Sequence, residues 1–265
     1  MKRMLVCMAG CLFLFSCSLI KIEPDSVASR RSANGTKPEG QWDISGDITI
    51  ANIWGQRFSP PERYARSLYN LKTQVEKRTN LNVTIRDHVY LDSPHLLDMP
   101  FVYITTENAF DLTEQEIANL NRYLSSGGFL LLDNALAGQE NSRVEASYRK
   151  MMRDTLSSSG EFLQIRNSHE IYKCFYELDG PPIGVEIKNS VDKLQRADVN
   201  PARPISDPVR FLEGITIGDR LAVILSNKGY VVSWLDISGN DPQFKMGVNM
   251  IIYAITHPDG LFFKQ

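Results

Sequence analysis

Residues 101–134, FVYITTENAFDLTEQEIANLNRYLSSGGFLLLDN, contain the pattern that decides the fold. Two apolar runs of strand length, FVYIT and GFLLLD, flank a segment in which apolar residues recur at the spacing of an α-helix. Thr113 and Glu116 have the spacing of a capping box at the helix start, and Gly127 and Gly128 are expected to end the helix. The stretch therefore predicts a strand, a helix and a second strand in one βαβ unit.

The second strand of this unit shows where a ligand is expected to bind. Residues 129–132 are apolar at four consecutive positions, as in interior strands of parallel sheets that are covered on both faces. The strand then ends in the polar residues Asp133 and Asn134, and Glu107 follows the first strand. Because open parallel sheets bind ligands at the carboxyl ends of their strands, these three residues are candidate site residues.

The neighbouring stretches continue the alternation of strands and helices. Residues 47–53 (DITIANI) and 81–91 (LNVTIRDHVYL) have strand patterns, and between them a helix is expected to begin with Ser59 as its N-cap. After the central unit, Ser142 and Glu145 have the spacing of another capping box. Right-handed crossovers then predict a mainly parallel sheet with helices on both faces and a strand order such as 2-1-3-4-5.

The C-terminal half is less regular at first. Residues 162–208 lack a clear period and are rich in proline, so we expect a long irregular insertion there. Residues 215–226 (ITIGDRLAVILS) and 230–236 (YVVSWLD) are expected to form two adjacent strands. The pattern of the last part predicts a helix over about residues 242–256.

The N-terminus predicts export. Two basic residues precede an apolar run, residues 4–15, that is too short to span a bilayer comfortably. The run ends in Leu14, Phe15, Ser16 and Cys17, which resembles a bacterial lipoprotein box. We therefore expect a signal peptide at residues 1–16 and a lipid on Cys17, with an ordinary signal peptide or an uncleaved anchor as the alternative.

Lipidation would divide the rest of the chain into two parts. Residues 17–41 are polar, with several serines, prolines and glycines, and are expected to be a flexible tether. Residues 42–265 are expected to form the folded domain. Ser18 follows the lipidated cysteine, and by resemblance to other lipoproteins this favours the outer membrane or its periplasmic face over the inner membrane. The membrane is then a partner through the lipid on Cys17.

Composition and motifs argue against several other classes of function. The formal net charge is -2 at pH 7, and cleavage would also remove Lys2 and Arg3, so the charge opposes binding to nucleic acid. No phosphate-binding loop or dinucleotide fingerprint occurs, and the four histidines lack the spacing of metal ligands. We expect no cofactor and no metal site, and we expect the remaining thiol, Cys174, to be buried.

Five stretches, taken in order, resemble a known family. They are residues 67–83, 101–134, 169–182, 212–226 and 245–255. Together they resemble an uncharacterised bacterial envelope family of the class I glutamine amidotransferase-like superfamily, related to trehalose-utilisation-type proteins. The resemblance covers about residues 47–256, and it implies a flavodoxin-like three-layer α/β sandwich.

The chain departs from that superfamily at the catalytic position. Glutamine amidotransferases place a nucleophilic cysteine on a tight turn after a strand, where a histidine can take its proton. Here the matching turn, at Asp133, Asn134 and Ala135, holds no thiol, and no Gly-x-Ser-x-Gly motif occurs anywhere. The resemblance and this departure together favour a non-catalytic envelope module that binds a small ligand, such as a sugar, or another protein.

The alternative is a hydrolase acting on a sugar or cell-wall-type substrate. Glu107, Asp133 and Asp236 are the carboxylates that would supply its acid and base, and His169 is the histidine to test with them. For either function, Tyr172, Tyr176 and Pro181 are expected to form one wall of the site. The ligand-binding candidates are polar or aromatic residues at predicted strand ends, together with His169: Trp54, Glu107, Asp133, Asn134, His169, Ser226 and Asn227.

Overall fold

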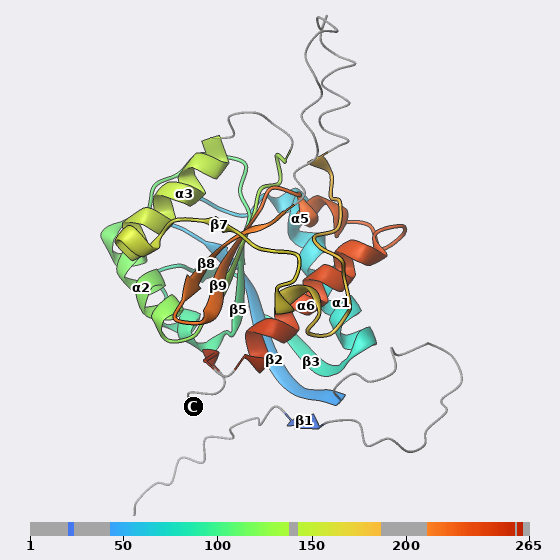
Figure 1. Ribbon diagram of the computed structural model, residues 1–265. Helices are drawn as coiled ribbons and strands as arrows, with labels where there is room; N and C mark the ends of the chain where they lie inside the picture. Colours follow the sequence, from blue (N-terminus) through green and yellow to red (C-terminus); the bar gives the residue numbers. More distant parts are fainter. Residues whose placement is uncertain (1–20, 24–42, 138–142, 187–210, 258, 262–265) are drawn as a thin grey trace, which may run out of the picture.

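A computed structural model describes residues 21–23, 43–137, 143–186, 211–257 and 259–261. In this part of the chain, nine strands form one mixed sheet, and helices cover both of its faces (Figure 1). Among the same residues, no helix is long and apolar enough to cross a membrane.

The centre of the sheet is parallel. It consists of β2 (Asp43–Trp54), β3 (Asn80–Ile85), β4 (Val89–Tyr90), β5 (Phe101–Ile104), β6 (Phe129–Asp133) and β9 (Arg220–Ser226). Both β3 and β4 pair with β2, and the order then runs β2, β5, β6, β9. The predicted order 2-1-3-4 is confirmed by β3-β2-β5-β6, and β9 takes the fifth place.

Three strands at the margins run antiparallel to their neighbours. β8 (Glu213–Ile217) pairs with β9, and β7 (Leu163–Gln164) pairs with β8. β1 (Lys21–Glu23) pairs with the first residues of β2. This last pairing differs from the expected flexible tether over residues 17–41, because three of its residues belong to the sheet.

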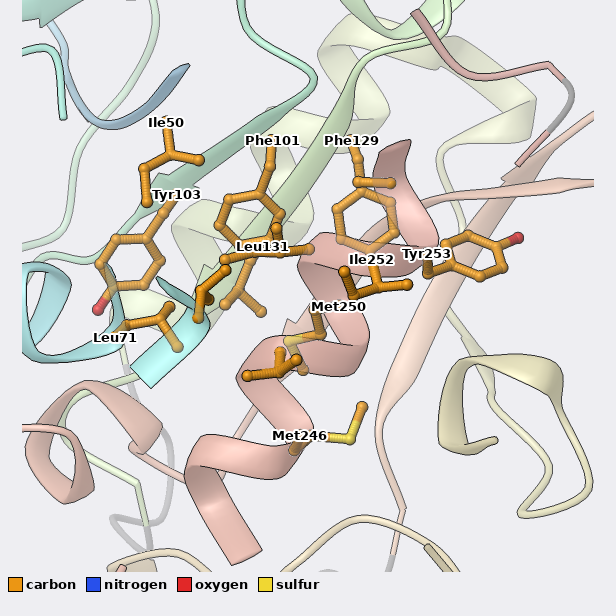
Figure 2. Packing of buried hydrophobic residues seen from close by; sticks show 14 of the residues in the cluster. Ile50, Leu71, Phe101, Tyr103, Phe129, Leu131, Met246, Met250, Ile252 and Tyr253 are labelled. Atoms are coloured by element: carbon orange, nitrogen blue, oxygen red, sulfur yellow. The ribbon is translucent and has the colours of Figure 1, made fainter. Parts of the chain in front are cut away.

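The helices form the two outer layers. α1 (Ala65–Arg78) and α6 (Asp241–Thr256) cover one face, and α2 (Glu114–Ser125) and α3 (Arg143–Leu156) cover the other. Figure 2 shows Met250 and Ile252 of α6 next to the side chains of β5 and β6, among them Phe101 and Phe129. In the described residues, short 3-10 helices lie between these elements: η1 (Glu62–Tyr64), η2 (Pro94–Asp98), η3 (Ser157–Ser159) and η4 (Glu170–Tyr172).

The central βαβ unit is confirmed. The Thr113 side chain accepts a hydrogen bond from the Glu116 N–H, and the Glu116 carboxylate accepts one from the Thr113 N–H, which is the predicted capping box. Gly127 has φ of 110°, so the turn between α2 and β6 needs a residue without a Cβ. Residues 129–132 are fully buried between the two helical layers.

Four local predictions were wrong. Residues 81–91 are not one strand, because they form β3 and β4 with a turn between them. Residues 230–236 are not a strand, because α5 (Tyr230–Ser233) is a short helix. Residues 215–226 are not one strand but the β8–β9 hairpin, which turns at Gly218. Ser59 does not cap α1, since that helix is entered through η1 from Pro61 and has no side-chain cap. The expected cap at Ser142 lies outside the described residues.

Tertiary contacts explain the helix in place of the predicted strand. Gly229 has φ of 64° and turns the chain after β9, and the Asp133 carboxylate accepts the Val231 N–H at 2.7 Å. The rings of Tyr230 and Trp234 stack at 6.0 Å, at the i,i+4 spacing that a helix brings together. Asp133 lies 98 residues before Val231 in the sequence, so the apolar, β-branched pattern of residues 230–236 alone indicates a strand.

Candidate functional site

A pocket of about 370 Å³ opens at the carboxyl ends of β2 and β3, beside the start of α1. This is the edge of the sheet at which open α/β folds bind ligands. Its volume lies in the range of small-molecule sites. The lining residues come from β2, from the turn before α1 with its first turns, and from the loop after β3: Asn52, Trp54, Pro60, Pro61, Glu62, Ala65, Leu68, Tyr69, Ile85, Arg86, Asp87 and His88.

Aromatic rings form one wall of this pocket. Trp54 is half-buried, and its ring lies 4.9 Å from that of His88 and 6.2 Å from that of Tyr90, measured between centroids. His88 has φ of 54°, a left-handed conformation that is uncommon for a residue with a side chain. The turn between β3 and β4 thus places His88 beside Trp54. Trp54 was among the predicted site residues, whereas His88 was not.

The charged groups of the pocket are either paired or exposed to solvent. Arg86 donates to the Asp98 carboxylate at 3.1 Å, and the Tyr69 hydroxyl donates to Asp87 at 3.4 Å. Glu62 is exposed. The pocket therefore combines an apolar, aromatic interior with charges that are paired or solvated, which suits a neutral ligand better than a strongly charged one.

Glu107, a predicted site residue, is not a free carboxylate. It forms an ion pair with Arg63 and accepts the Tyr64 hydroxyl at 2.6 Å. Both partners belong to η1, which precedes α1. Glu107 therefore ties the loop after β5 to the start of α1. Its partners lie in sequence between the pocket residues Glu62 and Ala65, but Glu107 itself does not line the pocket.

Four other candidates do meet at the carboxyl ends of β6 and β9. Asp133 pairs with Ser226 across the two strands, and the Asn134 side chain donates to the Asn227 Oδ1 at 3.0 Å. Asn134 also accepts the Leu136 N–H on its own Oδ1. Asp133, Asn134 and Ser226 are at most 2% exposed, so this group is a closed polar junction and not an open cleft.

Burial changes the titration of Asp133. Loss of solvent raises the pKa of this carboxyl from 3.8 to about 6, against the opposing effects of the Ser226 hydroxyl and of the Val231 and Tyr230 N–H groups. The neighbouring Glu186 carboxylate raises the pKa further. Oδ2 accepts the Val231 N–H, but Oδ1 has no hydrogen-bond partner among the described residues.

A buried ion pair at this junction escaped the sequence analysis. Lys228 Nζ lies 2.8 Å from Glu186 Oε1, and the two side chains are 1% and 3% exposed. The Val185 N–H also donates to the Lys228 carbonyl, and the Tyr230 hydroxyl donates to the Pro182 carbonyl. Residues 182–186 are thereby fixed against α5 and the end of β9.

His169 lies far from the other candidates. Its ring is 5.9 Å from that of Tyr253, whose hydroxyl accepts the Leu221 N–H near the start of β9. Figure 2 shows Tyr253 and Tyr103 at opposite ends of the row of side chains that faces α6. His169 accepts the Ile171 N–H as the cap of η4, and burial lowers its pKa. The candidates of the hydrolase alternative therefore do not converge.

The expected wall from the insertion is not at the pocket either. Tyr172 is buried in the core, and Tyr176 lies between Arg78 and Lys245, with cation–ring distances of 5.7 Å and 5.4 Å. Asp236 is exposed, and its carboxylate accepts the Ser238 N–H. In the described part of the chain, no group of three His, Cys, Asp or Glu side chains could hold a metal ion.

Comparison with known proteins places the chain in a family without assigning a reaction. Residues 60–255 match the family described as "Domain of unknown function (DUF4159)". A comparison with curated proteins returned no match. The matched residues include α1, the central βαβ unit, the polar junction and α6, so the match covers most of the fold described above.

Proposed function

Since the chain belongs to the DUF4159 family of domains of unknown function, its function must be argued from the site, and we propose that it is a non-catalytic ligand-binding module of the cell envelope. A lipid on Cys17 tethers it to the outer membrane or to the periplasmic face of the envelope. The pocket beside Trp54 binds a small neutral molecule, for which a sugar is the first candidate.

The observation that carries this proposal is the position and lining of the pocket. It lies at the carboxyl edge of the parallel sheet, and Trp54 and His88 line it together with Pro60 and Leu68. Half-buried aromatic rings with a wet edge are suited to molecules that have both an apolar face and hydroxyl groups. Its volume of about 370 Å³ suits a molecule of one or two rings.

The fold supports a finer assignment to the amidotransferase-like superfamily. A parallel order of β3, β2, β5, β6 and β9, with helices on both faces, agrees with a flavodoxin-like sandwich. In that arrangement the turn after β6 is where the nucleophile would stand. Asn134 occupies this turn, and its side chain is used in hydrogen bonds to Asn227 and Leu136, which is consistent with a domain that has no acyl-transfer chemistry.

The same geometry counts against the hydrolase. Glu107 is held by Arg63, Asp133 is fully buried, and His169 lies at the opposite end of the core. An acid and a base that act on one glycosidic bond must both reach the substrate. These three groups do not reach one pocket, so binding without catalysis is the better account.

Binding is tested with the purified chain and its Trp54→Ala variant. Sugars, amino acids and peptidoglycan fragments are screened by thermal shift, and each hit is measured by calorimetry. We expect Trp54→Ala to lose binding and Tyr176→Ala, an aromatic residue away from the pocket, to retain it. Loss of binding in Tyr176→Ala but not in Trp54→Ala would move the site to the insertion, and no hit in any class would remove the proposal.

The lipid anchor is tested separately by metabolic labelling with a fatty acid. Wild type should incorporate the label and Cys17→Ala should not, because only the thiol of Cys17 can carry the lipid in the expected lipoprotein box. Equal labelling of the two chains would refute the anchor and leave the ligand-binding proposal to stand on the pocket.

A further inference from the structure

Three buried polar atoms that have no hydrogen-bond partner among the described residues gather beneath α5. They are the Tyr103 hydroxyl, the Thr105 hydroxyl and Asp133 Oδ1, on side chains that are at most 1% exposed. None of them lines the pocket beside Trp54. They therefore form a feature separate from the proposed ligand site.

Strand register brings these atoms together. Ile104 pairs with Leu132, so the next residues along each strand, Thr105 and Asp133, also lie side by side. Tyr103 is two residues before Thr105 and points to the same face, because side chains alternate along a strand. That face is the one covered by α1, α5 and α6, where the Tyr103 ring lies 6.2 Å from the ring of Trp234.

Their titration also reflects this proximity. Burial raises the pKa of Tyr103 well above its ordinary value, and the charge of Asp133 raises it further, while the Thr105 hydroxyl lowers it. The Tyr103 hydroxyl is therefore close enough to feel both other groups, although none of the three makes a hydrogen bond of normal geometry with another.

A polar atom that stays unpaired in a core costs free energy, so buried polar groups without a protein partner are usually satisfied by ordered water. Buried water molecules typically make about three hydrogen bonds to such groups. Two hydroxyls and a carboxyl oxygen can offer a water molecule both donors and acceptors. Their number and chemistry match this requirement.

We propose that Tyr103, Thr105 and Asp133 form a binding site for one ordered water molecule, which links the ends of β5 and β6 beneath α5. Asp133 Oδ2 already holds the Val231 N–H of α5, and the water supplies the partner of Oδ1. The water is thus part of the contact that keeps α5 on the sheet. This proposal does not depend on the pocket or on the lipid anchor.

The first test is the melting temperature of two variants of the purified protein, Tyr103→Phe and Thr105→Val. Each removes one partner of the water, so each should lower the melting temperature by about 2–4 °C. The double variant should lose less than the sum, because both hydroxyls serve the same water molecule.

The chain offers matched controls. Among the described residues, the Tyr172 and Thr155 hydroxyls are also buried without a hydrogen-bond partner, but they lie in η4 and α3, outside the pair of strands that carries the three atoms. Tyr172→Phe and Thr155→Val remove an unpaired group, so the melting temperature should stay the same or rise. If Tyr103→Phe and Thr105→Val behave like these controls, or if only one of the two lowers the melting temperature, the site is refuted.

A high-resolution crystal structure gives the direct answer. Electron density for a water molecule within hydrogen-bonding distance of all three side chains would establish the site. Direct hydrogen bonds among Tyr103, Thr105 and Asp133, with no water between them, would overturn it whatever the melting temperatures show.

Discussion

Replacing Asp133 with asparagine should change how the stability of this protein depends on pH. Asp133 is fully buried, and its pKa is raised to about 6 from 3.8, mainly by loss of solvent. Between these two values the folded state keeps a proton that the unfolded state has lost. The contribution of Asp133 to stability is therefore largest below about pH 4 and is lost as the pH rises through about 6.

The size of the effect follows from the shift. About two pH units separate the folded from the ordinary pKa, and each unit corresponds to about 1.4 kcal/mol, so the contribution of Asp133 to wild-type stability should fall by about 3 kcal/mol between pH 4 and pH 8. A hydrogen bond from the proposed water to Oδ1 favours the carboxylate and would reduce this loss.

Asp133→Asn removes the titrating group but keeps an oxygen that can accept the Val231 N–H. Urea unfolding of both proteins at several pH values gives the difference in free energy of unfolding at each pH. We expect this difference to move by about 3 kcal/mol in favour of the variant from pH 4 to pH 8, because the groups that do not interact with Asp133 contribute equally in the two proteins and cancel. A difference that is constant with pH would show that Asp133 does not titrate as a buried carboxyl, and the reasoning would fail.

Three further predictions concern single residues. Gly127→Val should destabilise by more than about 1 kcal/mol, because a Cβ there would lie 2.7 Å from the Asp259 carbonyl oxygen at a φ of 110°; an unchanged melting temperature would contradict this. Lys228→Met should cost about 3–5 kcal/mol, since the buried Glu186 carboxylate loses its cation. Addition of Glu186→Leu should recover most of that loss, and equal stability of the single and double variants would argue against the ion pair. Burial raises the pKa of the Cys174 thiol to about 12, so iodoacetamide should react slowly with the native protein at pH 8 and quickly in denaturant; equal rates would refute this.

The parts of the fold that were predicted correctly are those with local causes. The capping box of Thr113 and Glu116 and the left-handed Gly127 are written within a few residues, so the central βαβ unit could be derived directly. The strand order followed from the alternation of elements and the handedness of crossovers. α5 could not be derived, because it depends on Asp133, which lies 98 residues before Val231.

The candidate site was predictable only as an edge of the sheet. Sequence order places Trp54, Asp133 and Ser226 at strand ends, and the structure confirms that position. The sequence does not show which of these side chains are open to solvent. His88 lines the pocket because its backbone adopts a left-handed conformation, and Lys228 is buried in an ion pair with Glu186, which lies 42 residues away in the sequence. His169 caps η4 and does not reach that edge, and a segment rich in aromatic residues gives no indication of the edge on which it lies.

The pairing of β1 with β2 determines how far the domain can stand from a membrane. Lys21 pairs with Ser45 at the beginning of β2, so the sheet holds the chain only four residues after Cys17. With a lipid on Cys17, this connection would span at most about 14 Å, far less than a tether that continues to residue 41. The amino edge of the sheet would then lie near the lipid headgroups, and the pocket at the carboxyl edge would open away from the membrane, toward molecules that diffuse in the aqueous compartment.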